Sequence, residues 1–353
     1  MHSITHLPAQ AVVGGVDTHL DTHTAAAVTG TGVFLGSRQF PATSAGYRQL
    51  LDWLQGFGVV DRVGVEGTGS YGAGLTRHLT ARQVEVVEVD RPDRATRRRQ
   101  GKSDPIDAHN AAMAVLSGRA TGVPKDSLGK VEALRNLRVA RNDAVNHRAQ
   151  TITKLKAIIA TAPNELRDQF KPLGTPDLIR QVAALRPDLA AAAAGDITAA
   201  VKTTMRSLAR TYRHLSDQIA ELDALITPLI RVINPTILDV HGLGPDTAGQ
   251  LLVTAGSNPT RMRSEACFAM LTGAAPLPAS SGRTNRHRIN HGGDRQANKA
   301  LWRIALTRMA TDQRTKNYIA KRTQEGLTKR DIIRCLKRYI AREIFPILTL
   351  DKP

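Results

Sequence analysis

The order of secondary structure expected in the first 120 residues is the strongest constraint on the fold of this chain. Apolar segments at 12–17, 24–29 and 33–40 follow one another with only turn-length polar steps between them. A helix, a strand, a second helix, a strand and a third helix are expected next. A doubly wound nucleotide-binding domain would need a crossover helix between its first strands, and none fits there. The order instead predicts an α/β domain with a ribonuclease H-like fold.

The rest of the chain is expected to be mostly helical. Residues 131–159 contain no Gly or Pro, and apolar residues recur at helical spacing from about 196 to 230. These two helices predict an antiparallel hairpin that serves as a coiled-coil dimerisation arm. A basic amphipathic helix is expected at 329–347. We expect three domains, with boundaries at 10–125 for the ribonuclease H-like domain, 126–234 for the helical coiled-coil segment, and 235–350 for a mostly α-helical domain with a helix-hairpin-helix-like element.

Charge is distributed unevenly along the chain. The net charge is +18 over 353 residues, but residues 1–90 hold 5 basic and 8 acidic side chains, whereas residues 281–345 hold 17 and 5. Such an excess favours a polyanionic partner, since each neutralised phosphate releases condensed counterions. An aromatic content of 4% argues against an RNA-binding domain that stacks bases on aromatic side chains.

Several classes of protein are excluded by composition. The two cysteines, Cys267 and Cys335, are too few for a thiolate metal cage and suggest a reducing compartment. No apolar run approaches the roughly 20 residues that a membrane-spanning helix needs, and the first residues lack the features of a signal peptide. We therefore expect a cytoplasmic protein with no membrane partner.

Four carboxylates occur where a ribonuclease H-like fold would bring them together. Asp17 ends the first expected strand and Glu66 ends the fourth, and these strands are neighbours in such a sheet. Asp104 and Asp107 lie three residues apart on one face of the following helix. Converging carboxylates repel one another unless a dication neutralises them. Oxygen ligands suit Mg²⁺, which can polarise a phosphodiester, so the sequence predicts a magnesium site.

Two other interpretations of these residues stay open. Each acid could be only a helix cap or a surface charge. Alternatively, Asp17, His19, Asp21 and His23 alternate in sequence, so their side chains could share one face of a strand and hold a transition metal, unless the chain turns there.

The C-terminal part contains two features that suit nucleic acid. The glycines of the turn at 242–244 can expose backbone N–H groups to a phosphate. Further on, Ser280 and Ser281 precede Gly282 in a loop rich in arginine. This loop could be a flexible turn with solvated charges. Alternatively, one of its serines is a nucleophile, and the arginines of the loop stabilise a phosphoryl-transfer transition state. The residues that we expect to contact nucleic acid are Lys102, Gly242, Gly244, Arg283, Arg286, Arg288, Arg295 and Lys299.

Several ordered motifs together resemble the IS110/IS116/IS902 family of insertion-sequence transposases. They are GVDTHLDTH at 15–23, VEGTGSY at 65–71 and GKSDPIDA at 101–108, followed by segments at 237–248 and 271–301 that are similar to the C-terminal part of the family. One departure is Leu20, where many relatives carry Lys.

The resemblance implies a composite active site. The acids of a RuvC-like DEDD domain would hold Mg²⁺, and the serine before glycine in a C-terminal transposase domain would be catalytic. By position that serine is Ser281, with Ser280 as the adjacent candidate. The resemblance also implies that the two domains meet across protomers of a homo-oligomer, a dimer or tetramer. A structured noncoding guide RNA encoded beside the gene would pair with donor and target DNA.

The function implied is DNA recombination through a 5′-phosphoserine intermediate. One alternative is a Mg²⁺-dependent nuclease of the Holliday-junction type, which uses the acids and water and forms no covalent intermediate. The other is a nucleic-acid-binding protein without catalysis, in which the acids are structural.

Overall fold

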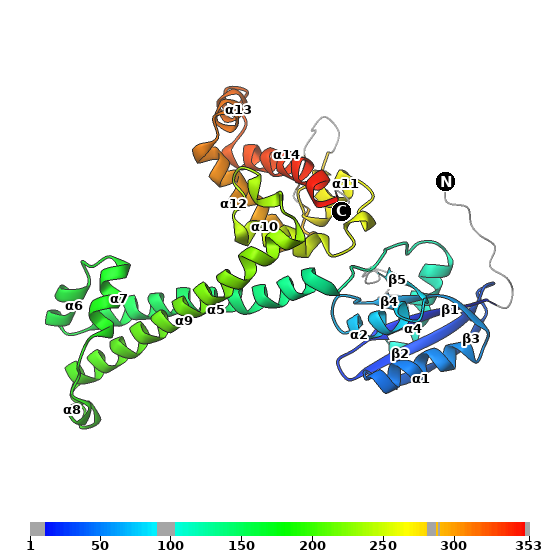
Figure 1. Ribbon diagram of the computed structural model, residues 1–353, viewed down its shortest axis with the longest axis horizontal. Coiled ribbons are helices and arrows are strands. Elements are labelled where there is room, and N and C mark those ends of the chain that lie inside the picture. Colours follow the sequence, from blue (N-terminus) through cyan, green and yellow to red (C-terminus); the bar gives the residue numbers. More distant parts are fainter. Residues whose placement is uncertain (1–10, 90–102, 281–286, 289, 350–353) are drawn as a thin grey trace. The chain divides into compact units, whose positions relative to one another are not determined.

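The computed structural model describes residues 11–89, 103–280, 287–288 and 290–349 (Figure 1). The chain divides into two compact units. The first comprises the chain up to Leu128 together with Ala255–Arg263, and the second comprises Gly129–Thr254 together with the chain from Ser264 onward.

Five strands form one mixed sheet in the described part of the first unit. They are β1 (Ala11–Thr18), β2 (Thr22–Thr29), β3 (Phe34–Pro41), β4 (Val59–Glu66) and β5 (Glu85–Val89). Their spatial order is β3-β2-β1-β4-β5. The first three strands are antiparallel neighbours, whereas β1 pairs with β4, and β4 with β5, in parallel. This arrangement fits the ribonuclease H-like α/β fold that the order of elements predicts.

Helices cover both faces of this sheet. On one face, Leu50 of α1 (Ser44–Gln55) and Leu75 of α2 (Ala73–Thr80) share a buried core with Val16 of β1. On the other face, Ala112 of α4 (Asp104–Leu116) packs with Val13 of β1. Alternate residues of β1 therefore face opposite helices, as the two-residue period of a strand requires.

Gly15 allows α4 to lie directly against β1. A Cβ atom at this position would lie 2.2 Å from both the Ala108 carbonyl oxygen and the Ala112 nitrogen. Only a residue without a side chain permits so close an approach of two backbones. The first turn of α4 is thereby fixed at the same face of the sheet as Asp17.

The segment Ala255–Arg263 joins the first unit through hydrogen bonds that link Ser257 and Asn258 to residues 124–128. Asn258 accepts a hydrogen bond from the Asp126 nitrogen at 2.9 Å and donates one to the Pro124 oxygen at 2.9 Å. This short segment, which contains η2 (Pro259–Arg261), lies far along the sequence from the sheet that it accompanies.

Two long helices dominate the second unit. α5 (Gly129–Thr161) and α9 (Ile197–Ile233) lie side by side (Figure 1). The absence of Gly and Pro predicts the first of these helices, and the spacing of apolar residues predicts the second. They run antiparallel, because Arg141 near the start of α5 pairs with Asp223 near the end of α9. Between them the chain forms α6 (Asn164–Phe170), α7 (Thr175–Ala183) and α8 (Leu189–Ala193). A coiled coil and a role in dimerisation stay predictions.

The remaining elements are mostly helical, as expected. They are η1 (Ile237–Asp239), α10 (Pro245–Ala255), α11 (Glu265–Leu271), β6 (Leu277–Pro278), β7 (His287–Arg288), α12 (Arg295–Thr311), α13 (Gln313–Gln324) and α14 (Lys329–Thr349). Across the described ranges, none of the helices combines the length and the apolar character that a membrane span requires.

Candidate active site

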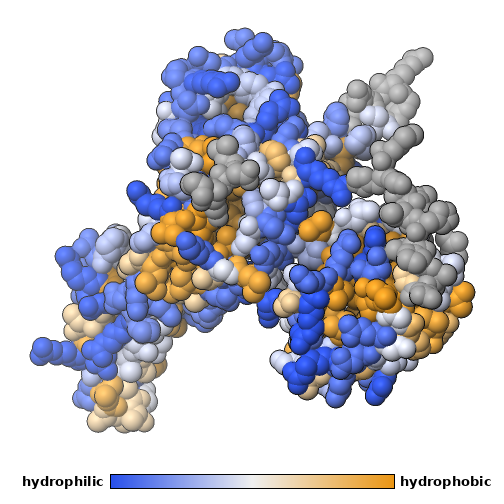
Figure 2. Space-filling model, turned by 45° about the vertical axis from the view of Figure 1, so that its right-hand side comes forward, coloured by the Kyte–Doolittle hydropathy of each residue, from blue (hydrophilic) through white to orange (hydrophobic). Residues whose placement is uncertain are grey.

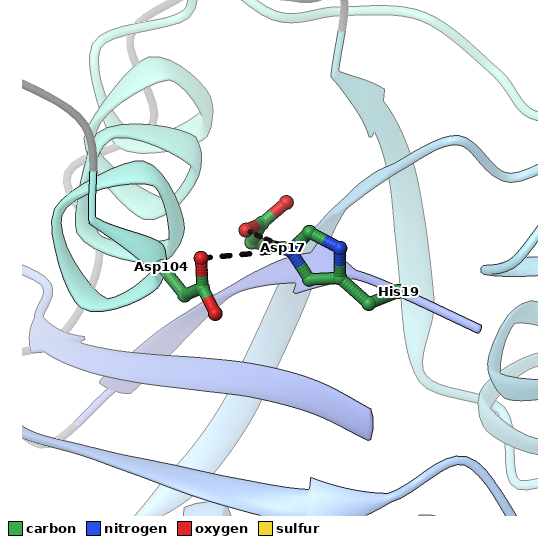
Figure 3. A group of neighbouring side chains, drawn as sticks. All are labelled: Asp17, His19 and Asp104. Atoms are coloured by element: carbon green, nitrogen blue, oxygen red, sulfur yellow. Dashed lines mark hydrogen bonds and ion pairs between the residues drawn. The ribbon is translucent and has the colours of Figure 1, made fainter. Parts of the chain in front are cut away.

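Asp17, His19 and Asp104 converge at one edge of the sheet (Figure 3). The Nε2 atom of His19 lies 3.1 Å from Oδ2 of Asp17 and 3.5 Å from Oδ1 of Asp104. One ligand atom of each residue lies within 4.8 Å of the others. The three residues come from the end of β1, the following turn and the first turn of α4.

The local fold explains why these side chains meet. Asp17 has the same parity along β1 as Gly15, so its side chain emerges on the face that α4 covers. After Thr18 the chain reverses, and the His19 nitrogen donates a hydrogen bond to the Thr22 oxygen at 3.0 Å. This turn holds the His19 imidazole beside the two carboxylates.

Glu66 and Asp107 lie near this group but are not part of it. Val16 of β1 is in register with Val65 of β4, so Asp17 and Glu66 end adjacent parallel strands. The Thr18 hydroxyl also donates to the Glu66 backbone oxygen at 2.9 Å. Asp107 follows Asp104 by one helical turn and is buried. The fold therefore gathers all four predicted acids at one end of the sheet, and it brings two of them within reach of one ion.

The alternative in which four alternating residues share one face is wrong. The chain turns after Thr18, and His23 lies on β2 with its ring stacked on Tyr47 of α1 at a centroid distance of 5.6 Å. His23 is therefore on the face opposite to α4, and burial lowers the pKa of its imidazole. His19, which sequence analysis considered only within that alternative, instead joins Asp17 and Asp104.

The chemistry of this group suits a divalent cation. Two carboxylates supply the hard oxygen donors that Mg²⁺ and Mn²⁺ prefer, and an imidazole nitrogen extends the set toward transition metals. Asp17 is only 7% exposed. A partly buried carboxylate close to a second carboxylate is stabilised by a neighbouring positive charge, which a bound cation would supply.

The loop that contains the serine predicted to be a nucleophile is only partly described. Ser281, Arg283, Arg286 and Lys102 lie outside the described residues. Ser280 is exposed, two residues after β6.

Three of the predicted nucleic-acid contacts from this region are exposed. Arg288 lies on β7, where it pairs with Leu277 of β6. Arg295 and Lys299 lie in the first two turns of α12. The Asp294 carboxylate caps this helix by accepting hydrogen bonds from the nitrogens of Gln296 and Ala297.

The turn that contains Gly242 and Gly244 lines a hollow of about 590 Å³ beside α10. The Gly244 nitrogen donates to the Thr247 hydroxyl at 3.1 Å, so this N–H group already has a partner inside the turn. Positive charge reaches the hollow from Arg141 and Arg303. Both arginines pair with Asp246, so they, like the Gly244 amide, already have partners within the protein.

Asp246, on α10, contacts residues of α5 and α12 beside this hollow. Its carboxylate accepts a hydrogen bond from Arg138 of α5 at 3.1 Å, pairs with Arg303 of α12, and lies 3.6 Å from Arg141. Burial acts to raise the pKa of Asp246, but the guanidinium groups of Arg138, Arg303 and Arg141 outweigh it, so the net shift is downward. An ionised Asp246 thus holds α10 against the hairpin.

A ribonuclease H-like sheet with acids at the end of adjacent parallel strands defines a class of nucleic-acid-processing domain. Similarity to known protein families identifies the family within this class. A family model described as a transposase, of the IS110 DEDD type, matches residues 14–162. A second, described as the transposase IS116/IS110/IS902 family, matches residues 234–320. The chain belongs to the IS110/IS116/IS902 family of transposases.

One curated relative supports this assignment. The chain is 29% identical over 155 residues to the insertion element IS110 uncharacterized 43.6 kDa protein of Streptomyces coelicolor. The match covers 43% of this chain and 38% of that protein. The chain therefore spans well under half of the length of the curated relative that it matches.

Proposed function

We propose that this protein is the DNA transposase of an insertion sequence, which cuts and rejoins DNA strands with Mg²⁺ and a serine nucleophile. The observation that carries the proposal is the convergence of Asp17 and Asp104, which are distant in sequence, on one imidazole in a chain of the transposase family. A structural role for these acids would not require them to approach one another.

The four acids Asp17, Glu66, Asp104 and Asp107 would hold the metal, with His19 beside two of them. When bound, Mg²⁺ supplies charge stabilisation to the phosphodiester that is cut. The contribution of the chain itself is positional: the contact at Gly15 fixes the distance between the strand that carries Asp17 and the helix that carries Asp104.

The serine at 281, with Ser280 as the adjacent candidate, would carry out the covalent step. Its hydroxyl oxygen attacks the phosphorus, the bond from phosphorus to the 3′ oxygen breaks, and the 3′ oxygen leaves as a hydroxyl with the proton that the serine loses. The resulting 5′-phosphoserine ester conserves the energy of the broken bond, so rejoining needs no ATP. Arg283, Arg286 and Arg288 would stabilise the negative charge that develops on the phosphate.

The partners in this proposal are nucleic acids and further copies of the chain. Donor and target DNA are the substrates, and a guide RNA selects the sites by base pairing while the protein contacts the backbone. The basic segment at 281–345 suits this division of roles. A homo-oligomer, a dimer or tetramer, would bring the acids of one protomer to the serine of another.

The test is covalent trapping. Purified protein is incubated with Mg²⁺ and end-labelled DNA that spans the element junction, together with RNA transcribed from the flanking DNA, and adducts are separated under denaturing conditions. The wild type and the Ser280→Ala variant should form a covalent adduct, whereas Ser281→Ala should form none and still bind DNA.

Other outcomes reject the proposal or part of it. An adduct in Ser281→Ala removes this serine from the mechanism. Cleavage without any adduct, unaffected by either substitution, favours the Holliday-junction type of nuclease. Binding without cleavage in any metal favours the noncatalytic alternative.

A further inference from the structure

A basic cavity of about 980 Å³ lies within the second unit and is lined by α14, by the segment 273–276 that precedes β6, and by β7. Its lining includes Pro276, which directly precedes β6, Arg288 of β7, and Lys337 of α14. The strand β6 leads within two residues to Ser280. Residues on both sides in sequence of the loop that carries the candidate nucleophile therefore line the cavity.

Lys337 is a buried cation on this lining. It is 8% exposed, and its Nζ atom donates a hydrogen bond to Oδ1 of Asn298 at 2.9 Å. Within the described ranges, no carboxylate lies within ion-pair distance of this ammonium group. Burial lowers its pKa, and the nearby Arg334 adds to the shift. A buried ammonium group without a counter-ion is costly, so an anion that entered the cavity would be bound favourably.

The other cations of α14 on the lining already have acidic partners. Arg334 pairs with Asp331, and Arg338 forms two hydrogen bonds with Glu265, which also lies 3.8 Å from Arg342. These carboxylate partners weaken the electrostatic attraction between the arginines and an incoming anion. Arg288, which is exposed on β7, has no such carboxylate partner in the described part of the chain. Lys337 and Arg288 are thus the cations best placed to bind an added negative charge.

The surroundings hold Lys337 in place before any ligand arrives. Asn298, which accepts its hydrogen bond, donates through Nδ2 to the Thr272 oxygen at 2.8 Å. The next residue, Gly273, lies so close to Gly293 that a Cβ on Gly293 would be 2.3 Å from the Gly273 nitrogen. Because Asn298 is itself held by Thr272, the hydrogen bond that Lys337 donates to it positions the ammonium group before an anion binds.

We propose that this cavity binds a phosphate of the DNA strand that is presented to the serine loop, with Lys337 as the buried cation and Arg288 as its exposed partner. The inference rests on the proposed function, because residues on both sides in sequence of Ser280 and Ser281 line the cavity. DNA is favoured over RNA for the same reason, since the strand beside the nucleophile is the strand that reacts.

The test compares two charge-matched variants in the full-length protein. Lys337→Gln removes the buried cation, and Lys321→Gln removes an exposed cation on α13 that does not line the cavity. Affinity for a single-stranded DNA oligonucleotide is measured in EDTA over a range of salt concentrations. Lys337→Gln should weaken binding about tenfold or more, as expected for a charge-assisted hydrogen bond, and should reduce the salt slope by about 0.7. Lys321→Gln should change affinity less than about twofold.

A second variant separates binding from folding. Lys337→Met removes a buried charge that has no acidic partner, so its Tm without DNA should equal or exceed that of the wild type, while the rise in Tm on adding the oligonucleotide should shrink. A lower Tm without DNA would identify Lys337 as a structural residue and overturn the proposal.

Further outcomes would also overturn it. One is that Lys337→Gln binds DNA with wild-type affinity. Another is that Lys321→Gln loses as much DNA affinity as Lys337→Gln. A third concerns an RNA oligonucleotide of the same sequence. If Lys337→Gln lost affinity for this RNA while its DNA binding stayed unchanged, the cavity would be assigned to RNA. Because binding in EDTA needs no cleavage, failure of the covalent-adduct test leaves these results interpretable, and the two proposals fail separately.

Discussion

At the residue scale, the Asp17–His19–Asp104 group concentrates like charge around one imidazole. The His19 ring lies between carboxylates that come from β1 and α4 and approaches each of them within 3.5 Å. Coulomb repulsion between two carboxylates is strong where water is partly excluded, and a cation relieves it. The group is therefore organised for a cation before one binds.

Removing one charge from this group should weaken metal binding. In Asp104→Asn the amide keeps the shape but loses the negative charge, so we expect Mn²⁺ affinity, measured by calorimetry, to fall about tenfold or more. Mg²⁺-dependent DNA cleavage should be lost. Asp52→Asn, at an exposed position on α1, is the matched control and should behave as the wild type. Equal metal affinity in the two variants would contradict the assignment of Asp104.

At the scale of elements, the site depends on how closely α4 lies against β1. Gly15 faces the α4 backbone, and Gly64 of β4 faces the same helix, where a Cβ would lie 2.6 Å from the Val115 side chain. Two adjacent parallel strands thus present glycines to one helix. Its N-terminal turn carries Asp104 and Asp107, so packing along the helix sets the geometry of the acids at its end.

A methyl group at Gly15 should disturb both packing and the site. In Gly15→Ala the helix must move away from β1, and we expect the free energy of unfolding to fall by about 1–3 kcal/mol, as for other overpacked cores. Mn²⁺ affinity should fall as well, because Asp104 moves relative to Asp17. Gly69→Ala is the control, since a Cβ at that position would meet no atom within 4 Å. Chemical denaturation and calorimetry of both variants test this, and a stable Gly15→Ala with unchanged metal affinity would reject it.

At the scale of the whole molecule, charge and surface character divide along the chain. The first 90 residues carry a small acidic excess, and the segment 281–345 is strongly basic. Figure 2 shows hydrophilic residues covering the region of α13 at the top of the view. A polyanion should therefore be drawn to the C-terminal helices, while the acids of the sheet stay available for a cation.

We expect a discrete RNA to copurify with the protein when the gene is expressed with its native flanking DNA. Sequencing of the bound RNA should recover one structured transcript that maps to the flanks, and expression without the flanks is the control. Random cellular RNA, bound with an affinity that fades steeply with salt, would instead mean that the basic charge acts without specificity. That result would count against RNA guidance, but it would not bear on the assignment of the metal site.

The order of the elements and the ends of the strands that carry acids can be predicted from the amino-acid sequence. Apolar runs and their spacing predict the strands that become β1 and β4, and Asp17 and Glu66 follow from them as strand-end acids. The long helix α5 is predicted from a segment without Gly or Pro, and α9 from the periodicity of its apolar residues. These features are local, because a strand or helix imposes its period on the residues that form it.

Which side chains meet depends on the three-dimensional packing of the elements. The turn after Thr18 sends His23 to one face of the sheet and leaves His19 beside Asp17. The docking of Asn258 beside Pro124, and the burial of Lys337 beside Asn298, join residues from distant parts of the chain. Periodicity carries no information about such contacts, because they depend on turn geometry and on how closely two backbones can approach.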